Sequence, residues 1–234
     1  MVLLICVLLI AVLFAAVFRK PLKRFPWIFY LCALALDYLA VLSLSTTFPH
    51  ALQAYLFYPI QRCFVAFALF ALVMFIGVLK NNSRLRMYFM PIRAELSILA
   101  CIFALVHIIK HTMNYLPKIA APGTLIEPPY FVSVLLALLI SALMLMLGIT
   151  SFKLIHERIP PLIWKRIQRF AYPFFLLIYL HISLFLLPSI LGGGSAAVGN
   201  FIFYSALFVL YSILRLRKAF KDHSEREGRV LDSS

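Results

Sequence analysis

Seven long apolar segments, separated by short polar or basic stretches, are the feature that most limits how this chain can fold. They run approximately over residues 2–18, 26–46, 53–79, 91–115, 129–151, 163–187 and 198–217. Most of them reach the ~20 residues that an α-helix needs to cross the hydrocarbon core of a bilayer. With 64% hydrophobic residues among 234, a soluble domain could not bury this much apolar surface. The sequence therefore predicts an all-α fold, a polytopic transmembrane helical bundle in one compact unit.

The basic residues are distributed unequally between the two sides of this predicted bundle. Of the 22 Lys and Arg residues, 19 follow the first, third, fifth and seventh segments, whereas only Lys110 and Lys118 fall on the other side. Short loops rich in Lys and Arg remain in the cytoplasm. We therefore expect a multi-pass protein of the cell membrane with its N-terminus outside and its C-terminus in the cytoplasm. The net charge of +14 is then a determinant of topology. The first segment lacks a basic n-region, so we expect it to be a retained helix.

Two histidines, His107 and His181, lie inside apolar segments that otherwise carry almost no charge. An ionisable residue within the bilayer is costly and indicates a functional site. Segments four and six run in the same direction. At ~1.5 Å per residue, His107 lies about 21 Å beyond Arg93 and His181 about 25 Å beyond Trp164. Two imidazoles at one depth on two helices have the arrangement that binds one haem iron from opposite faces. We therefore predict that His107 and His181 are the metal ligands of haem b.

Further polar side chains lie near the same depth. Arg62 lies about 26 Å from the inner end of segment three by the same rise, and a cation there is a natural partner for a haem propionate. The alternative is that Arg62 extends to the outer headgroups. His111 shares a helix face with His107, so it is a second candidate for cofactor binding, although its place near the helix end favours a surface role. For either histidine alone, an interhelical hydrogen bond would be the simpler interpretation.

Four cysteines and one aspartate also lie in the apolar segments, and we do not assign them to a cofactor. The four cysteines, Cys6, Cys32, Cys63 and Cys101, form no C-x-x-C pair, so we interpret them as packing residues. Asp37 lies near the middle of the second segment. A proton relay, pairing to a basic residue and a protonated packing role all remain open for it.

A set of short motifs resembles a known family. These motifs are Gln61–Arg62, Arg93 spaced from His107, Pro129–Tyr130, Ile149–Thr150–Ser151, and the run from Trp164 through Arg169 and Tyr172 to His181. In order and spacing, over approximately residues 55–217, they resemble the ferric reductase-like transmembrane domain. Within it they look most like the haem-binding membrane subunit of the methionine sulfoxide reductase PQ system, the MsrQ or YedZ family.

The resemblance implies a six-helix core that holds b-type haem, with ligands at the positions of His107 and His181. It divides the chain into two N-terminal helices over residues 1–50, of which the first is extra and expected to be peripheral, a haem-binding core over 51–218 and a cytoplasmic tail over 219–234. The family carries a further histidine where this chain has Gln168. Glutamine is a poor ligand for haem iron, so hydrogen bonding to a quinone and a purely interfacial role both stay open for this residue.

The sequence is thus interpreted as an electron-transfer subunit of an oxidoreductase system. The resemblance implies that electrons come from a quinol or a cytoplasmic flavin reductase, with quinone or flavin as a second cofactor. It also implies delivery to an extracytoplasmic reductase, such as a methionine sulfoxide reductase catalytic subunit. Two alternatives remain: a ferric or other metal reductase acting directly at the outer surface, and a cofactor-free transporter that uses the histidines and Asp37 for proton coupling.

Overall fold

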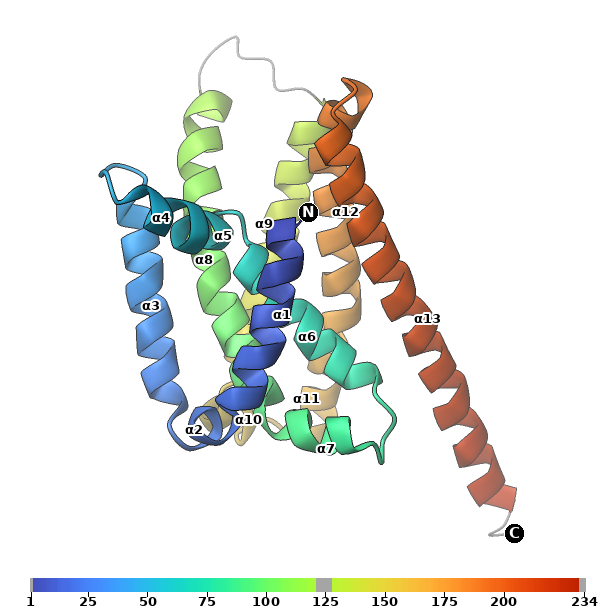
Figure 1. The fold of residues 1–234 in the computed structure, drawn as a ribbon. Coiled ribbons are helices and arrows are strands. Elements are labelled where there is room, and N and C mark those ends of the chain that lie inside the picture. The colour runs from blue at the N-terminus through green and yellow to red at the C-terminus, as the bar shows by residue number, and fades with distance from the viewer. Residues whose placement is uncertain (1, 121–127, 232–234) are drawn as a thin grey trace.

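The computed structural model describes residues 2–120 and 128–231, and every regular element within these ranges is helical (Figure 1). The elements are α1 (Val2–Val17), α2 (Arg19–Arg24), α3 (Pro26–Leu42), α4 (His50–Leu52), the π-helical turn η1 (Gln53–Phe57), α5 (Tyr58–Gln61), α6 (Phe64–Val78), α7 (Arg84–Phe89), the 3-10 turn η2 (Met90–Ile92), α8 (Arg93–Ala120), α9 (Pro128–Ile149), α10 (Lys153–His156), α11 (Pro161–Gln168), α12 (Ala171–Leu191) and α13 (Ser195–Leu231). The predicted all-α polytopic bundle is confirmed.

The seven predicted apolar segments are helical over most of their lengths. Four stretches are long and apolar enough to cross a membrane, namely Arg84–Pro117, Phe131–Ile149, Pro161–Leu191 and Ser195–Asp222. A fifth span results if the bent pair His50–Gln61 and Phe64–Val78 is counted as one. Helices α1 and α3 are apolar but shorter, with 16 and 17 residues. Helix α13 runs on to Leu231, so the expected tail begins inside a helix, and residues 232–234 lie outside the described part of the chain.

The third apolar segment is broken, whereas the sequence predicted one continuous helix. Helix α5 ends at Gln61, helix α6 begins at Phe64, and the two parts are bent by 50°. At the break, Cys63 has a φ of 62°, and it is the sole non-glycine residue with positive φ in the described ranges. A left-handed residue cannot continue a right-handed helix, so the chain changes direction there. As a result α4 and α5 run crosswise to the long helices, near the C-terminal end of α3 (Figure 1).

Helix α6 forms the centre of the bundle, with α1, α8 and α13 packed around it. Its alanines Ala66, Ala68 and Ala71 are almost completely buried. Small side chains let neighbouring helix backbones approach closely, which is how helices associate in a membrane. Leu4 and Ala15 of α1 are also buried in this packing. The central helix therefore fixes the positions of the helices that form the site described below.

Three cations from three elements bind carbonyl groups near the C-terminal end of α6. Arg86 of α7 donates to the carbonyls of Gly77 and Leu79, both at 3.2 Å, and Lys218 of α13 donates to the same oxygens at 2.9 and 2.8 Å. Arg93 of α8 donates to a carbonyl one turn earlier. Cations are favoured there because the last carbonyls of a helix lack intrahelical partners and the helix dipole is negative at that end. Helices α2, α7, α10 and α11 lie at this same end (Figure 1), which gathers basic residues on one side.

Candidate functional site

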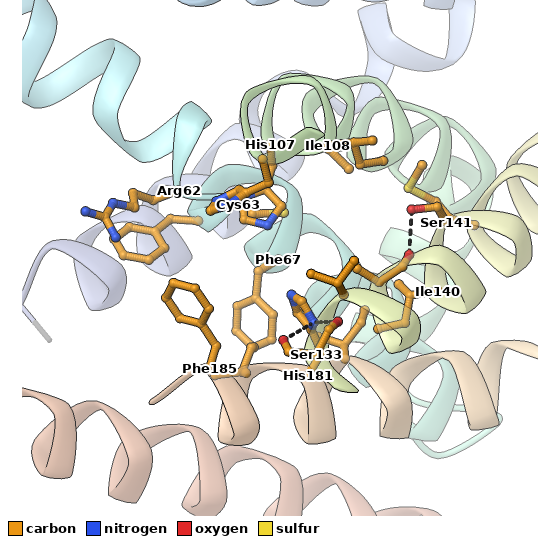
Figure 2. A pocket seen from close by; sticks show the side chains of 18 of the residues that line it. Arg62, Cys63, Phe67, His107, Ile108, Ser133, Ile140, Ser141, His181 and Phe185 are labelled. Carbon is orange, nitrogen blue, oxygen red and sulfur yellow. Dashed lines mark hydrogen bonds between the residues drawn. The ribbon is translucent and has the colours of Figure 1, made fainter. Parts of the chain in front are cut away.

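A cavity of about 470 Å³ lies among α6, α8, α9, α12 and α13. Its volume falls within the range of small-molecule and cofactor pockets. Most of its wall is apolar and aromatic, including Phe67, Phe70 and Phe185. Leu4 of α1 also lines it and is only 2% exposed, although we expected the first helix to be peripheral. Figure 2 shows that His107 and His181 reach this cavity from two different helices.

His107 is positioned by a backbone carbonyl at the helix break. The Nδ1 atom of His107 lies 3.2 Å from the carbonyl oxygen of Gln61. A carbonyl can only accept, so Nδ1 carries the proton and donates it. The lone pair of the ring then resides on Nε2. This carbonyl belongs to the last turn of α5, where carbonyls have no intrahelical partner, so the break at Cys63 is what provides the acceptor.

His181 is held in the same way by a different helix. Its Nδ1 lies 2.9 Å from the carbonyl oxygen and 2.9 Å from the hydroxyl oxygen of Ser133 in α9. The opposite tautomer would set the Nδ1 lone pair against the carbonyl oxygen, so the proton belongs on Nδ1 here as well. Ser133 is buried, with 3% of its surface exposed. Both histidines therefore offer Nε2 as the free nitrogen, and metal-binding histidines are commonly oriented by such a second hydrogen bond.

His111 and Arg62 line the same cavity, beside the two histidines. The ring of His111 lies 4.3 Å from that of His107 between centroids, and it stacks on Tyr115 at 5.9 Å. Arg62 is exposed and its guanidinium lies 5.2 Å from the centre of the Tyr58 ring. The structure thus brings four of the five predicted site residues to one cavity.

The fifth predicted residue, Gln168, belongs to a second and smaller cavity of about 230 Å³. Gln168 Nε2 donates to Thr150 Oγ1 at 3.2 Å, and Trp164 Nε1 donates to the Thr150 carbonyl at 3.0 Å. Arg93 and His156 also line this cavity. Because Arg93 also binds near the C-terminal end of α6, the second cavity lies toward the basic end of the bundle.

The two cavities share part of their walls. Phe70, Met144 and Phe174 line both of them. The rings of Phe70 and Phe174 pack edge to face, with their centroids 5.1 Å apart. A molecule in one cavity would therefore be separated from a molecule in the other by a single layer of side chains.

Two residues that orient the histidines were missed from the sequence, namely Gln61 and Ser133. Gln61 is one of the few buried polar residues, with 3% of its surface exposed. A polar residue within an apolar segment was the available signal for both, and only Gln61 belongs to one of the motifs given above. Asp37 is 6% exposed, and neither carboxyl oxygen has a hydrogen-bond partner within the described part of the chain. The structure therefore gives no support for its pairing to a basic residue.

Comparisons with known proteins bear on this site. A family model for the ferric reductase-like transmembrane component matches residues 62–179. An uncharacterized protein of Treponema pallidum (strain Nichols) is 37% identical over 164 residues, which are 70% of this chain and 45% of that protein. The chain thus spans less than half the length of this relative. No solved structure matches the chain. The matched family region includes Arg62, His107, His111 and Gln168, and it ends just before His181.

Proposed function

The chain belongs to the ferric reductase-like transmembrane component family, and we propose that it is a b-type cytochrome subunit that relays electrons across the membrane. In this proposal His107 and His181 would hold the iron of one haem b. The observation that carries it is the pair of imidazoles on α8 and α12 that line one cavity. Each has its Nδ1 proton engaged by a backbone carbonyl, which leaves Nε2 for a metal.

The residues of the large cavity fit a haem better than a bare metal ion. Over residues 2–120 and 128–231, no group of three or more His, Cys, Asp or Glu side chains is placed to hold a metal ion. Two histidines are enough when the metal is carried in a macrocycle that provides the remaining ligands. The apolar and aromatic wall suits a flat organic ring system. When bound, haem supplies a one-electron iron couple.

The polar residues beside the histidines have a distinct part in this proposal. Arg62 and His111 are the candidates for binding the haem propionates, because both line the cavity, and Arg62 is exposed while His111 is half-buried. Of the two, Arg62 is the better candidate, since guanidinium pairs with carboxylate through two hydrogen bonds and stays charged. Lys110 is less available, because its ammonium already donates to Gln61 Oε1 at 3.1 Å.

The second cavity is our candidate for the place where electrons enter. Gln168 retains one amide hydrogen and its carbonyl oxygen for a ligand after donating to Thr150. A quinone or a flavin ring system offers matching acceptors and donors, and Trp164 supplies an aromatic surface. The shared wall of Phe70, Met144 and Phe174 supports transfer between the two cavities, because it is one side chain thick. The donor is then a quinol or a cytoplasmic flavin reductase.

The proposed orientation in the membrane follows from charge, and the proposed direction of electron transfer follows from the family resemblance. The basic residues gather at the end that carries α2, α7, α10 and α11 (Figure 1), and such an end faces the cytoplasm. We therefore propose a protein of the cell membrane with its N-terminus outside and its C-terminus inside. Electrons would pass from the cytoplasmic side to an extracytoplasmic reductase, for which a methionine sulfoxide reductase catalytic subunit of the MsrQ or YedZ type of system is our candidate. We retain residues 51–218 as the proposed haem-binding core.

Replacement of the two histidines tests the ligand assignment. We expect His107→Ala and His181→Ala to lose the low-spin haem signal in a reduced-minus-oxidised optical spectrum, because each removes one axial ligand. His50→Ala is the matched control, since His50 is exposed in α4 and does not line the cavity. A wild-type spectrum in both variants would contradict the assignment.

Direct reduction of a metal at the outer surface is the second candidate function, because the matching family is described as a ferric reductase-like transmembrane component. The two functions separate when the pre-reduced wild-type protein is mixed with a ferric chelate under anaerobic conditions. Rapid re-oxidation of the haem by the chelate alone would favour a ferric reductase. Re-oxidation that requires an exported reductase subunit and its substrate would favour the electron-relay function.

A further inference from the structure

We propose that Gln61 is a positioning residue that fixes the orientation of His107 for haem ligation, an inference that rests on the proposed haem site. Gln61 ends α5, directly before the break at Cys63, and its side chain is buried. Its backbone carbonyl is the hydrogen-bond partner of His107. The side chain instead anchors the peptide group that bears this carbonyl.

The amide of Gln61 is hydrogen-bonded on both sides. Its Nε2 donates to the carbonyl of Ala40 at 3.0 Å and to the hydroxyl of Ser43 at 2.9 Å, both near the C-terminal end of α3. The Ser43 hydroxyl in turn donates to the Ala40 carbonyl at 2.8 Å. The Oε1 atom of Gln61 accepts from Lys110 Nζ at 3.1 Å. Both amide hydrogens and the oxygen are therefore used, which is the arrangement expected for a buried amide that rigidifies its surroundings.

These contacts join three helices at the point where the His107 acceptor lies. Gln61 contacts α8 at two positions, His107 and Lys110, which are three residues apart and so lie on one face of that helix. Its other bonds tie the same residue to α3. Because Cys63 adopts a left-handed conformation, α6 is not a continuation of α5. The peptide group of Gln61 is therefore not held in place by a following helical turn. The side-chain bonds to α3 and Lys110 replace that restraint.

A substitution of Gln61 should therefore change how firmly the His107 ring is oriented. A hydrogen bond from Nδ1 to a fixed carbonyl holds the imidazole plane and raises the basicity of Nε2. Removing a partner that orients a metal ligand outright typically lowers metal affinity by about 10- to 100-fold. A change of the Gln61 side chain keeps the carbonyl and removes only the bonds that hold it in place, so the lower end of that range is expected. A residue that only joined helices would alter stability, but it would leave the coordination of the iron unchanged.

The test compares Gln61→Leu, which removes the three side-chain bonds and keeps the volume, with Gln53→Ala. Gln53 lies in η1, on the same segment, and does not line the haem cavity. We expect Gln61→Leu to release haem to excess apomyoglobin about tenfold faster than wild type. We also expect its ferrous haem to bind carbon monoxide, because a loosened His107 vacates one axial position. Wild type and Gln53→Ala should retain their haem and not bind carbon monoxide.

The outcomes separate this inference from the function on which it rests. If wild type contains no haem, the proposed function fails, and this inference fails with it. If wild type contains haem and Gln61→Leu matches it in haem release and in carbon monoxide binding, only the role of Gln61 is refuted. If Gln61→Leu does not accumulate in the membrane, the rate of haem release from Ser43→Ala and Lys110→Met tests the role of Gln61 instead. Each of these variants removes one hydrogen-bond partner of the Gln61 side chain. Faster haem release in both supports the inference, and wild-type release in both overturns it.

Discussion

We expect the two oxygens of Ser133 to contribute unequally to holding His181, and this difference can be measured. The carbonyl oxygen and the hydroxyl oxygen both lie 2.9 Å from Nδ1. Ser133→Ala removes the hydroxyl and keeps the carbonyl, which is the acceptor that fixes the tautomer. We therefore expect the variant to retain low-spin haem with both histidines bound.

The size of the effect follows from the loss of one hydrogen bond. A single hydrogen bond contributes about 0.5–1.5 kcal/mol net, and about 1.4 kcal/mol corresponds to a factor of ten in an equilibrium constant. Ser133→Ala should thus weaken haem binding by between about twofold and tenfold. That is much less than the complete loss expected for His181→Ala.

The assay is the rate at which purified protein in detergent transfers its haem to excess apomyoglobin. Ser141→Ala is the matched control, because Ser141 lies on the same helix and lines the same cavity, but its hydroxyl donates to the carbonyl of Ala137 within α9. Loss of all haem from Ser133→Ala would mean that the hydroxyl, and not the carbonyl, holds the ring. A rate equal to that of Ser141→Ala would mean that the hydroxyl contributes nothing. Either result would contradict the expectation that the carbonyl fixes the tautomer and the hydroxyl adds one further hydrogen bond.

Two further predictions concern the second cavity and the packing of α8 against α9. Gln168→Leu should leave the haem content unchanged but slow the reduction of the haem by a quinol analogue, because it removes polar atoms from the smaller cavity alone. Stopped-flow absorbance measures the rate of reduction, and loss of haem from the variant would contradict the prediction. Gly148→Ala should destabilise the protein by about 1–3 kcal/mol through overpacking, because a Cβ there would lie 2.8 Å from Cys101 Sγ. Thermal unfolding should show a lower melting temperature for Gly148→Ala, and adding Cys101→Ala should restore part of it. Equal melting temperatures for Gly148→Ala and wild type would refute the prediction.

The general fold could be predicted because a helix that crosses a bilayer must be long and apolar, and such segments are visible in the sequence. The seven segments were found in this way, and each is helical over most of its length. The break at Cys63 could not be predicted. Neither Gly nor Pro occupies the position, and a left-handed cysteine within an apolar run has no signature in composition. Cys63 was interpreted as a packing residue, whereas it also marks the change of direction that provides the acceptor for His107.

The residues that reach the large cavity were predictable to the extent that charge within a membrane is costly. His107, His181, His111 and Arg62 were found because each stands out in an apolar segment, and all four line that cavity. Ser133 was not found, because a serine in a transmembrane helix commonly bonds to its own backbone, as Ser141 does. Its contact with His181 depends on how α9 is rotated against α12, and a single sequence does not contain that information.

The proposed haem lies between α8 and α12, and the proposed function depends on its presence. The most direct measurement is the pyridine haemochrome content of the purified wild-type protein, together with the spin state of its iron by electron paramagnetic resonance. We predict one haem b per chain with low-spin iron. A purified, folded protein without haem, or one whose haem is wholly high-spin, would contradict the account.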